Sequence, residues 1–262
     1  MSRGTPAQQQ AEALFKRSVL KQQKLDALVS VLGPTEGLRC LDLGSDNGVV
    51  SLLLRRRGGE WSSADLTEDS VAAIRELVGG EVLRTDGRRL PFGDAQFDRV
   101  VVVDMLEHVP DDQAFMAELA RITRPGGVLV VNTPHLMDTP LRRFRHAIGQ
   151  TDEKHGHLRP GYDARGLRTL FGRHFELAEH RTYSRFFSEA VDTAIHFALQ
   201  RLGKASSAKG MIVTGADLRK HRRLFLAYSA IYPFVWLLSR LDALLPWTEG
   251  YMLLARAKRT EN

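Results

Sequence analysis

Cys-Leu-Asp-Leu-Gly-Ser-Asp-Asn-Gly, at residues 40–48, is the stretch that decides the fold. The apolar run 38–43 carries one acid, Asp42, and breaks at Gly44, and Gly48 follows four residues later. Apolar residues at helical spacing come next. The pattern predicts a buried strand, a tight glycine turn and a helix. A ligand can approach the bare backbone of such a turn, where the N-terminus of the helix points at it.

Three later segments also read as strands, and each has an acid at or next to its end. They cover residues 60–66, 81–87 and 97–104. The acids recur at intervals of about 20 residues, the length of one strand-helix unit. Open α/β sheets bind ligands at the carboxyl ends of their strands. We therefore expect one rim to carry Asp42, Asp65, Asp86 and Asp104, although any one of them alone would read as a turn former or helix cap.

The rest of the chain supplies the remaining elements of an α/β sheet. These are a helix at 111–123, a turn at 124–127, a fifth strand at 128–132, a helix at 164–172 capped by Asp163, a sixth strand at 175–182 and a seventh, antiparallel strand at 249–256.

Taken together, these motifs resemble class I S-adenosylmethionine (SAM) methyltransferases, particularly the bacterial small-molecule group. The matching pieces are Leu41-Asp-Leu-Gly-Ser-Asp-Asn-Gly48, Ala64-Asp-Leu66, Thr85-Asp-Gly87, Leu90-Pro-Phe92, Phe97-Asp98, Asp104-Met-Leu-Glu-His108 and Arg124-Pro-Gly-Gly127. The match is strong over residues 37–135 and looser to about residue 185. It implies a doubly wound, seven-stranded, mostly parallel sheet of the Rossmann-like methyltransferase type. This chain adds a helical insertion between strands six and seven.

The resemblance also implies SAM as the cofactor, direct methyl transfer as the reaction, and a set of cofactor-binding residues. In the family's pattern the glycine loop lines the methionine part, the second strand's acid takes the ribose hydroxyls and the third strand's acid takes the adenine amino group. The residues assigned in this way are Asp42, Gly44, Ser45, Asp46, Gly48, Asp65, Leu66, Asp86, Gly87, Asp104 and Met105.

Asp46 departs from the family's pattern, which usually has glycine there. Aspartate tolerates left-handed backbone better than most residues, so we interpret it as tolerated. Its carboxylate could also meet the amino group of the cofactor. A protein with this fold that binds without catalysing stays open as an alternative for the same reason. Asp46 also occupies the middle glycine position of a dinucleotide fingerprint, which argues against an NAD dehydrogenase.

Length, composition and charge limit the domain count, the cellular compartment and the possible partners. The 262 residues are enough for one α/β domain with an insertion. Cys40 is the single cysteine, so we expect neither an internal disulfide nor a Cys/His metal cluster. The polar start of the chain reads as cytoplasmic, with a position peripheral to the inner membrane left open. A net charge of +6 allows an anionic partner, either nucleic acid or a membrane surface.

An RNA methyltransferase is the rival that the charge suggests. Asp104-Met-Leu-Glu lacks the Asn/Asp-Pro-Pro-aromatic sequence of base-amine methylases, and no separate RNA-binding domain is visible. We therefore do not expect nucleic acid as a partner.

The sequence divides into four parts. Residues 1–34 hold a helix predicted over 7–31, and 35–185 form the SAM-binding core. Residues 186–247 form a helical insertion for the substrate or a membrane, and 248–262 contain the final strand and tail.

Two histidines are candidates for a general base, which a hydroxyl acceptor needs. His135 follows the fifth strand, and His157 lies in a His-x-Arg-x-x-Tyr-like segment that related methyltransferases share. Imidazole titrates near neutrality and suits the role. For His157 and its neighbour His155, bracing a loop is the favoured alternative.

The insertion joins a basic cluster to an apolar, aromatic stretch. Arg219-Lys-His-Arg-Arg223 precedes 224–239, which is shorter than the ~20 residues of a membrane span and contains Pro233. The pattern fits a membrane-surface contact or a lipid-substrate pocket. The same pattern is also consistent with a helix hairpin that covers the chain's own sheet or forms a dimer interface. We expect a small, hydrophobic or lipid-linked acceptor, and the oligomeric state stays open.

Overall fold

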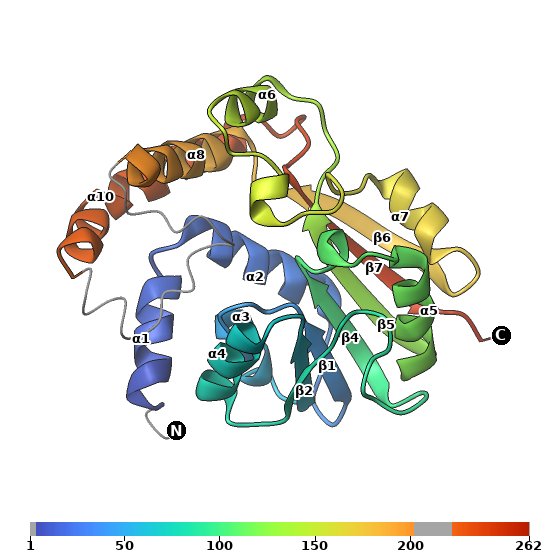
Figure 1. Ribbon diagram of the computed structural model, residues 1–262. Coiled ribbons are helices and arrows are strands. Elements are labelled where there is room, and N and C mark those ends of the chain that lie inside the picture. Colours follow the sequence, from blue (N-terminus) through green and yellow to red (C-terminus); the bar gives the residue numbers. More distant parts are fainter. Residues whose placement is uncertain (1–3, 202–221, 262) are drawn as a thin grey trace.

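The computed structural model describes residues 4–201 and 222–261, which form one seven-stranded sheet with helices on both faces (Figure 1). The strand order is β3-β2-β1-β4-β5-β7-β6. The strands are β1 (Arg39–Leu43), β2 (Glu60–Asp65), β3 (Val82–Arg84), β4 (Phe97–Val103), β5 (Thr123–Pro134), β6 (Phe175–Tyr183) and β7 (Met252–Arg259).

Strands β1 to β5 pair in parallel, and β7 runs antiparallel between β5 and β6. The doubly wound, mostly parallel sheet implied by the resemblance is confirmed. Because the order reverses between β1 and β4, the carboxyl ends of these strands border the crevice where such sheets bind ligands.

Helices cover both faces of the sheet, as the near-continuous apolar strands require. One core layer joins α2 and α3 to alternate strand residues such as Cys40 and Val101. The opposite layer joins α5 and α7 to their neighbours Leu41 and Val100. The helices of the core are α1 (Pro6–Phe15), α2 (Val19–Leu32), α3 (Val49–Arg55), α4 (Glu68–Val78), α5 (Asp112–Ile122), α6 (Pro140–Ala147) and α7 (Ala164–Phe171).

The single helix predicted over residues 7–31 is wrong, since the structure has α1 and α2 with a break between them. Ser18 begins α2 as its N-cap, where its side chain accepts a hydrogen bond from the backbone of Lys21. The turn predicted at 124–127 also differs, because β5 already begins at Thr123, which is paired with Phe97 across a register shift.

The insertion between β6 and β7 consists of α8 (Phe186–Arg201), α10 (Arg222–Arg240) and the short 3-10 helix η3 (Leu241–Leu244). Helices α8 and α10 contact each other at the edge of the molecule and also reach α2 (Figure 1). Residues 219–221 of the basic cluster lie outside the described residues. Among the helices that the structure describes, none has the length and apolar character needed to cross a membrane.

Candidate functional site

The loop between β1 and α3 is fitted tightly against its neighbours. A Cβ added at Gly44 would lie 2.3 Å from the carbonyl oxygen of Val103, and one at Gly48 would lie 2.7 Å from the Cα of Ile74. Both glycines have positive φ angles, as does Asp46, at 50°. The predicted glycine turn is therefore present, and its backbone passes directly beside the end of β4.

Asp65 ties this loop to the end of β2. Its Oδ2 accepts a hydrogen bond from the backbone N–H of Asp46 at 3.3 Å, and its Oδ1 accepts one from Leu66 at 2.7 Å. The side chain is buried, although it stands at the end of the strand. The structure thus brings together Asp65, Leu66 and the glycine loop, as the sequence predicted.

Asp86 follows β3 in a more open position. It is exposed, and its Oδ1 accepts a hydrogen bond from the backbone of Arg88, which lowers the pKa of the carboxyl below its usual range. The next residue, Gly87, is buried, and a Cβ there would lie 3.2 Å from a methyl carbon of Val109.

Asp42 is placed differently from the other acids. Its carboxylate is completely buried and forms an ion pair with Arg55 at 2.9 Å. Further hydrogen bonds come from the hydroxyl groups of Ser45, Ser51 and Ser63. These partners occupy both carboxylate oxygens, so Asp42 holds the loop and α3 in place rather than presenting a carboxylate to the rim.

Asp104 combines a strained backbone with several polar partners. Its φ angle is 45°, which is costly for a residue other than glycine. Its carboxylate accepts a hydrogen bond from Asn132 at 2.5 Å and forms an ion pair with Lys24 of α2. Met105 beside it is buried. The ammonium group of Lys24 therefore lies at the carboxyl end of β4.

Lys21, one helical turn before Lys24, also points into this buried region. Burial lowers the pKa of its ammonium group to about 8, and the positive charge of Lys24 adds to the effect, while Asp46 opposes it. For Lys24, burial acts in the same direction, but the attraction of Asp104 outweighs it and the pKa is raised. Neither lysine could be recognised from the sequence, because their positions depend on how α2 lies over the strands.

Two more groups border Asp104, the partly buried Tyr183 and the buried Glu107. The phenol of Tyr183 donates to Asn132 Oδ1 at 2.6 Å, so the chain of polar contacts runs from Tyr183 through Asn132 to Asp104. Glu107 is 1% exposed and accepts a hydrogen bond from the hydroxyl of Thr133 at 3.2 Å. Burial raises the pKa of Glu107 to about 8, and the charge of Asp104 contributes.

The two histidines proposed as bases lie in different surroundings. His135 is buried, and its Nδ1 lies 2.9 Å from the carbonyl oxygen of Gly250, so this nitrogen carries the proton. His157 packs against His108, with 4.9 Å between ring centroids, and against His155. Burial and these two neighbours lower the pKa of His157 to about 4. Such a weak base argues against His157 in proton abstraction.

The segment around His157 braces the turn that follows β4. The guanidinium of Arg159 donates to the carbonyl groups of Leu106 and Val109, both at 2.7 Å. Tyr162 donates to Asp112 at the start of α5 at 2.6 Å. These contacts agree with the bracing role that the sequence favoured for this loop.

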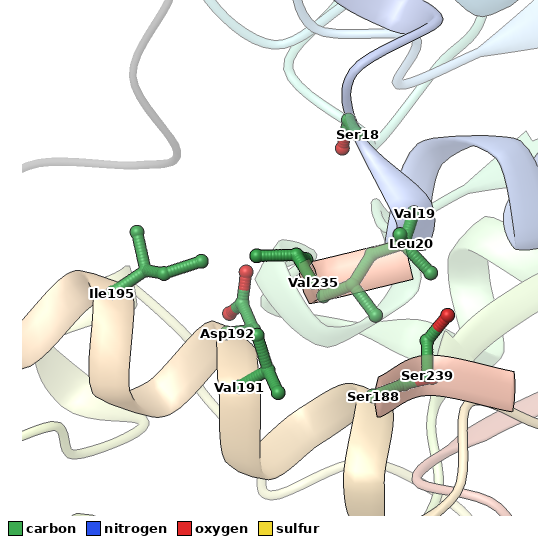
Figure 2. A pocket seen from close by; sticks show the side chains of 9 residues that line it. All are labelled: Ser18, Val19, Leu20, Ser188, Val191, Asp192, Ile195, Val235 and Ser239. Carbon is green, nitrogen blue, oxygen red and sulfur yellow. The ribbon is translucent and has the colours of Figure 1, made fainter. Parts of the chain in front are cut away.

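A pocket lies where α8 and α10 meet the start of α2 (Figure 2). None of the residues assigned to the cofactor lines it. Five of its nine lining residues are apolar, but three hydroxyl groups and one carboxylate help to make its surface more polar than apolar. The lining residues are Ser18, Val19, Leu20, Ser188, Val191, Asp192, Ile195, Val235 and Ser239.

Comparison with protein families adds independent information. Residues 41–131 match the family model described as a methyltransferase domain. A ubiquinone biosynthesis O-methyltransferase of Sinorhizobium medicae is 34% identical over 105 residues, which cover 38% of this chain and 42% of the relative. A demethylmenaquinone methyltransferase of Mycolicibacterium paratuberculosis is 37% identical over 107 residues, covering 39% of this chain and 44% of the relative. The chain thus spans less than half the length of these curated relatives.

Among solved structures, a putative methyltransferase of Bacillus halodurans has a similar fold. The TM-score is 0.58 with 18% sequence identity, and the match covers 90% of this chain and 98% of that one. The fold likeness therefore covers much more of the chain than the segment matched by sequence.

Proposed function

Because this chain carries a class I SAM-dependent methyltransferase domain, we propose that it transfers the methyl group of SAM to a small, hydrophobic or lipid-linked acceptor. The observation that carries the proposal is Asp65, a buried carboxylate at the end of β2 that is held between Leu66 and the glycine loop. We do not favour a role in binding nucleic acid.

The described residues fit the cofactor. Gly44 lets the loop pass directly beside the end of β4, because a Cβ there would lie 2.3 Å from the carbonyl oxygen of Val103. The two oxygens of Asp65 suit a pair of ribose hydroxyls, and Asp86 with Gly87 suits adenine. At the end of β4 the Asp104 side chain is 32% exposed, unlike that of Asp42, so its carboxylate can take the ammonium group of the methionine part beside that of Lys24.

We assign the other predicted cofactor-binding residues to the parts of SAM that they would contact. The loop residues Ser45 and Asp46 face the methionine part, Met105 packs beside it and Leu66 lies near adenine. Asp42 acts through the loop that it holds, since Arg55 and three serines occupy its oxygens.

When bound, SAM supplies an electrophilic methyl group next to a good leaving group, so the protein mainly has to align the acceptor. A hydroxyl acceptor must also lose a proton. We propose His135 for this role, because its Nδ1 donates to the Gly250 carbonyl and its Nε2 is then the basic nitrogen.

Calorimetric titration with SAM tests the site. Asp65→Ala removes a charged acceptor pair, so SAM affinity should fall by about 2–3 kcal/mol. Glu76→Ala, which removes an exposed acid of α4, is the matched control and should bind as the parent does. Equal affinity in the parent and in Asp65→Ala would show that the cofactor lies elsewhere.

The insertion supports a hydrophobic acceptor. It carries exposed apolar side chains on α10, and relatives that match the methyltransferase domain are named for ubiquinone biosynthesis and for demethylmenaquinone. We propose that the insertion, residues 186–247, guides such an acceptor toward the core formed by 35–185. Helices α1 and α2 of segment 1–34 pack beside this core, and β7 of segment 248–262 completes the sheet.

An apolar surface on the insertion supports contact with an anionic membrane. On α10, Phe234 is 68% and Leu237 59% exposed, and Trp247 beyond η3 is 76% exposed. Arg240 lies over the ring of Trp236 on the same helix. Exposed apolar area beside basic residues is typical of helices that lie on a membrane surface.

Cosedimentation with vesicles tests this contact. A double variant in which Phe234 and Leu237 are changed to Ser should bind anionic vesicles more weakly. The same result is expected for a variant with Gln in place of Arg219, Lys220, Arg222 and Arg223. Each basic residue near an anionic bilayer is worth about 1 kcal/mol, and salt weakens the attraction. Leu158→Ser, at an exposed apolar residue outside the insertion, is the control. A parent protein that ignores anionic vesicles at low salt, or buries this face in a dimer, would refute membrane contact.

A further inference from the structure

Three metal-binding side chains meet beside the carboxyl end of β4. Glu107 and His108 belong to the short 3-10 turn η1 (Leu106–His108), and His157 comes from the loop before α7. One potential ligand atom from each residue lies within 4.8 Å of the other two. We propose that Glu107, His108 and His157 form a divalent-cation site of the kind that takes Zn²⁺.

The orientation of His108 supports ligation. Its Nδ1 lies 2.8 Å from the carbonyl oxygen of Gly156. A carbonyl only accepts, so Nδ1 carries the proton and Nε2 carries the lone pair when the ring is neutral. Histidines that bind metals usually donate their other N–H to a carbonyl or carboxylate in this way, which fixes the ring.

His157 provides the second, independent observation. Its Nδ1 is buried and has no hydrogen-bond partner among the described residues. The Oδ1 of Asp152 lies 4.0 Å from it, beyond hydrogen-bond distance. A buried ring nitrogen without a partner is costly in a native protein. A small movement of the ring would allow this nitrogen to coordinate a cation.

Glu107 brings the negative charge that a dication requires. Its carboxyl is buried beneath the turn and accepts a side-chain hydrogen bond from Thr133. Ionising a buried carboxyl is expensive unless a positive charge compensates it. A cation bound by Glu107 and the two imidazoles would supply that charge.

The donor set selects the chemical class of the ion. Two imidazole nitrogens and one carboxylate are a common Zn²⁺ set, and they leave a fourth position for water or another oxygen ligand. Hard cations such as Mg²⁺ prefer sites made of oxygen atoms. The site would tie the loop that carries His157 to the turn after β4, beside Asp104. This role does not depend on methyl transfer.

A competition titration on the full chain tests the site. Protein freed of metal by a chelator, and carrying no histidine tag, is titrated with Zn²⁺ against a chromophoric chelator. We expect one strong site per chain. His108→Ala and His157→Ala should each weaken the binding by at least tenfold, on the scale of about 10–100-fold that even supporting residues of metal sites show.

Two histidine variants serve as matched controls. His155→Ala changes the ring next to His157 that is not part of the group, and His180→Ala changes an exposed histidine of β6. Both should keep the parent's affinity. Co²⁺ in place of Zn²⁺ should give the absorption of a four-coordinate site in the parent and in the controls, but not in His108→Ala or His157→Ala.

The test relies on the histidine variants, because Glu107→Gln would change a fully buried group and disturb folding as well as metal binding. The folding of the histidine variants is checked separately. Each histidine variant should keep the parent's circular dichroism and lose only the rise in melting temperature that Zn²⁺ causes in the parent. The proposal is overturned if the parent binds no stoichiometric Zn²⁺, if His108→Ala and His157→Ala bind as the parent does, or if His155→Ala loses affinity to the same extent.

Discussion

Asp42 shows how one residue can occupy a functional position and still serve the structure. It is the last residue but one of β1, where the resemblance places a cofactor-binding acid. Its carboxylate, however, is committed to Arg55 of α3 and to hydroxyl groups around it. A buried ion pair adds little net stability, but a buried charge left alone is strongly destabilising. The geometry of the glycine loop therefore depends on Arg55.

Arg55→Met should lower the free energy of unfolding by about 3–5 kcal/mol, because it leaves the Asp42 carboxylate buried without its cation. Urea denaturation measures the change. Arg56→Ala is the control: that arginine is 44% exposed and pairs with Glu12 at the surface, where a pair is worth about 1 kcal/mol or less. Similar losses in the two variants would contradict the assigned role of Arg55.

Lys21 gives the stability a dependence on pH. Its pKa is about 8 in the folded chain and 10.5 as the ordinary value, so folding releases a proton between these pH values. The free energy of unfolding should therefore gain a contribution as pH rises from about 8 toward 10.5, and lose it as pH falls through 8.

Denaturation of Lys21→Met across this range measures the contribution, because the variant should lack the rise. Lys16→Met, at an exposed lysine that follows α1, is the control and should behave as the parent. The same slope in the parent and in Lys21→Met would mean that the ammonium is not buried in solution.

At the scale of elements, the sequence predicted best the elements whose own residues determine their structure, independently of tertiary packing. Apolar runs and the glycine turn predicted β1, β4 and α3, because a strand buried on both faces needs such a run wherever it lies. The break between α1 and α2 was missed, since the apolar period continues across it and only the cap at Ser18 marks it.

The candidate site was predictable where backbone conformation and strand ends define it. Asp65 and Gly44 are examples, because both belong to the strand-turn-helix pattern. Lys24 and Glu107 were not predictable, since their roles arise from the packing of α2 and η1 against the end of β4. No local pattern marks a lysine that will meet an aspartate 80 residues away.

The backbone conformation of the glycine loop leads to a prediction for Asp46. Its φ angle of 50° favours glycine, so Asp46→Gly should leave stability unchanged or raise it by up to about 1 kcal/mol. SAM affinity should stay equal or improve. Thermal melts and titration with SAM measure both quantities. A large loss of affinity would show that the Asp46 carboxylate contacts the cofactor and that its side chain is more than tolerated.

At the scale of the whole molecule, binding SAM should stabilise the fold by mass action. SAM at 100 times its dissociation constant adds about 2.7 kcal/mol, which corresponds to a rise of roughly 5–10 °C in melting temperature for a chain of this size. Scanning fluorimetry with and without SAM measures it. The same SAM concentration should move Asp65→Ala far less. A parent melt that saturating SAM leaves in place would refute cofactor binding by the folded chain.

The position of β7 has a consequence for synthesis on the ribosome. This strand is the last in the chain but lies inside the sheet, between β5 and β6, and about 70 residues separate it from β6. At bacterial and eukaryotic elongation rates of about 5–20 residues per second, β5 and β6 wait roughly 3–14 s for it. During that interval both strands present open edges that invite pairing with other nascent chains. Slow codons between residues 184 and 251 would lengthen this exposure, so translation speed over the insertion is expected to govern the yield of folded protein.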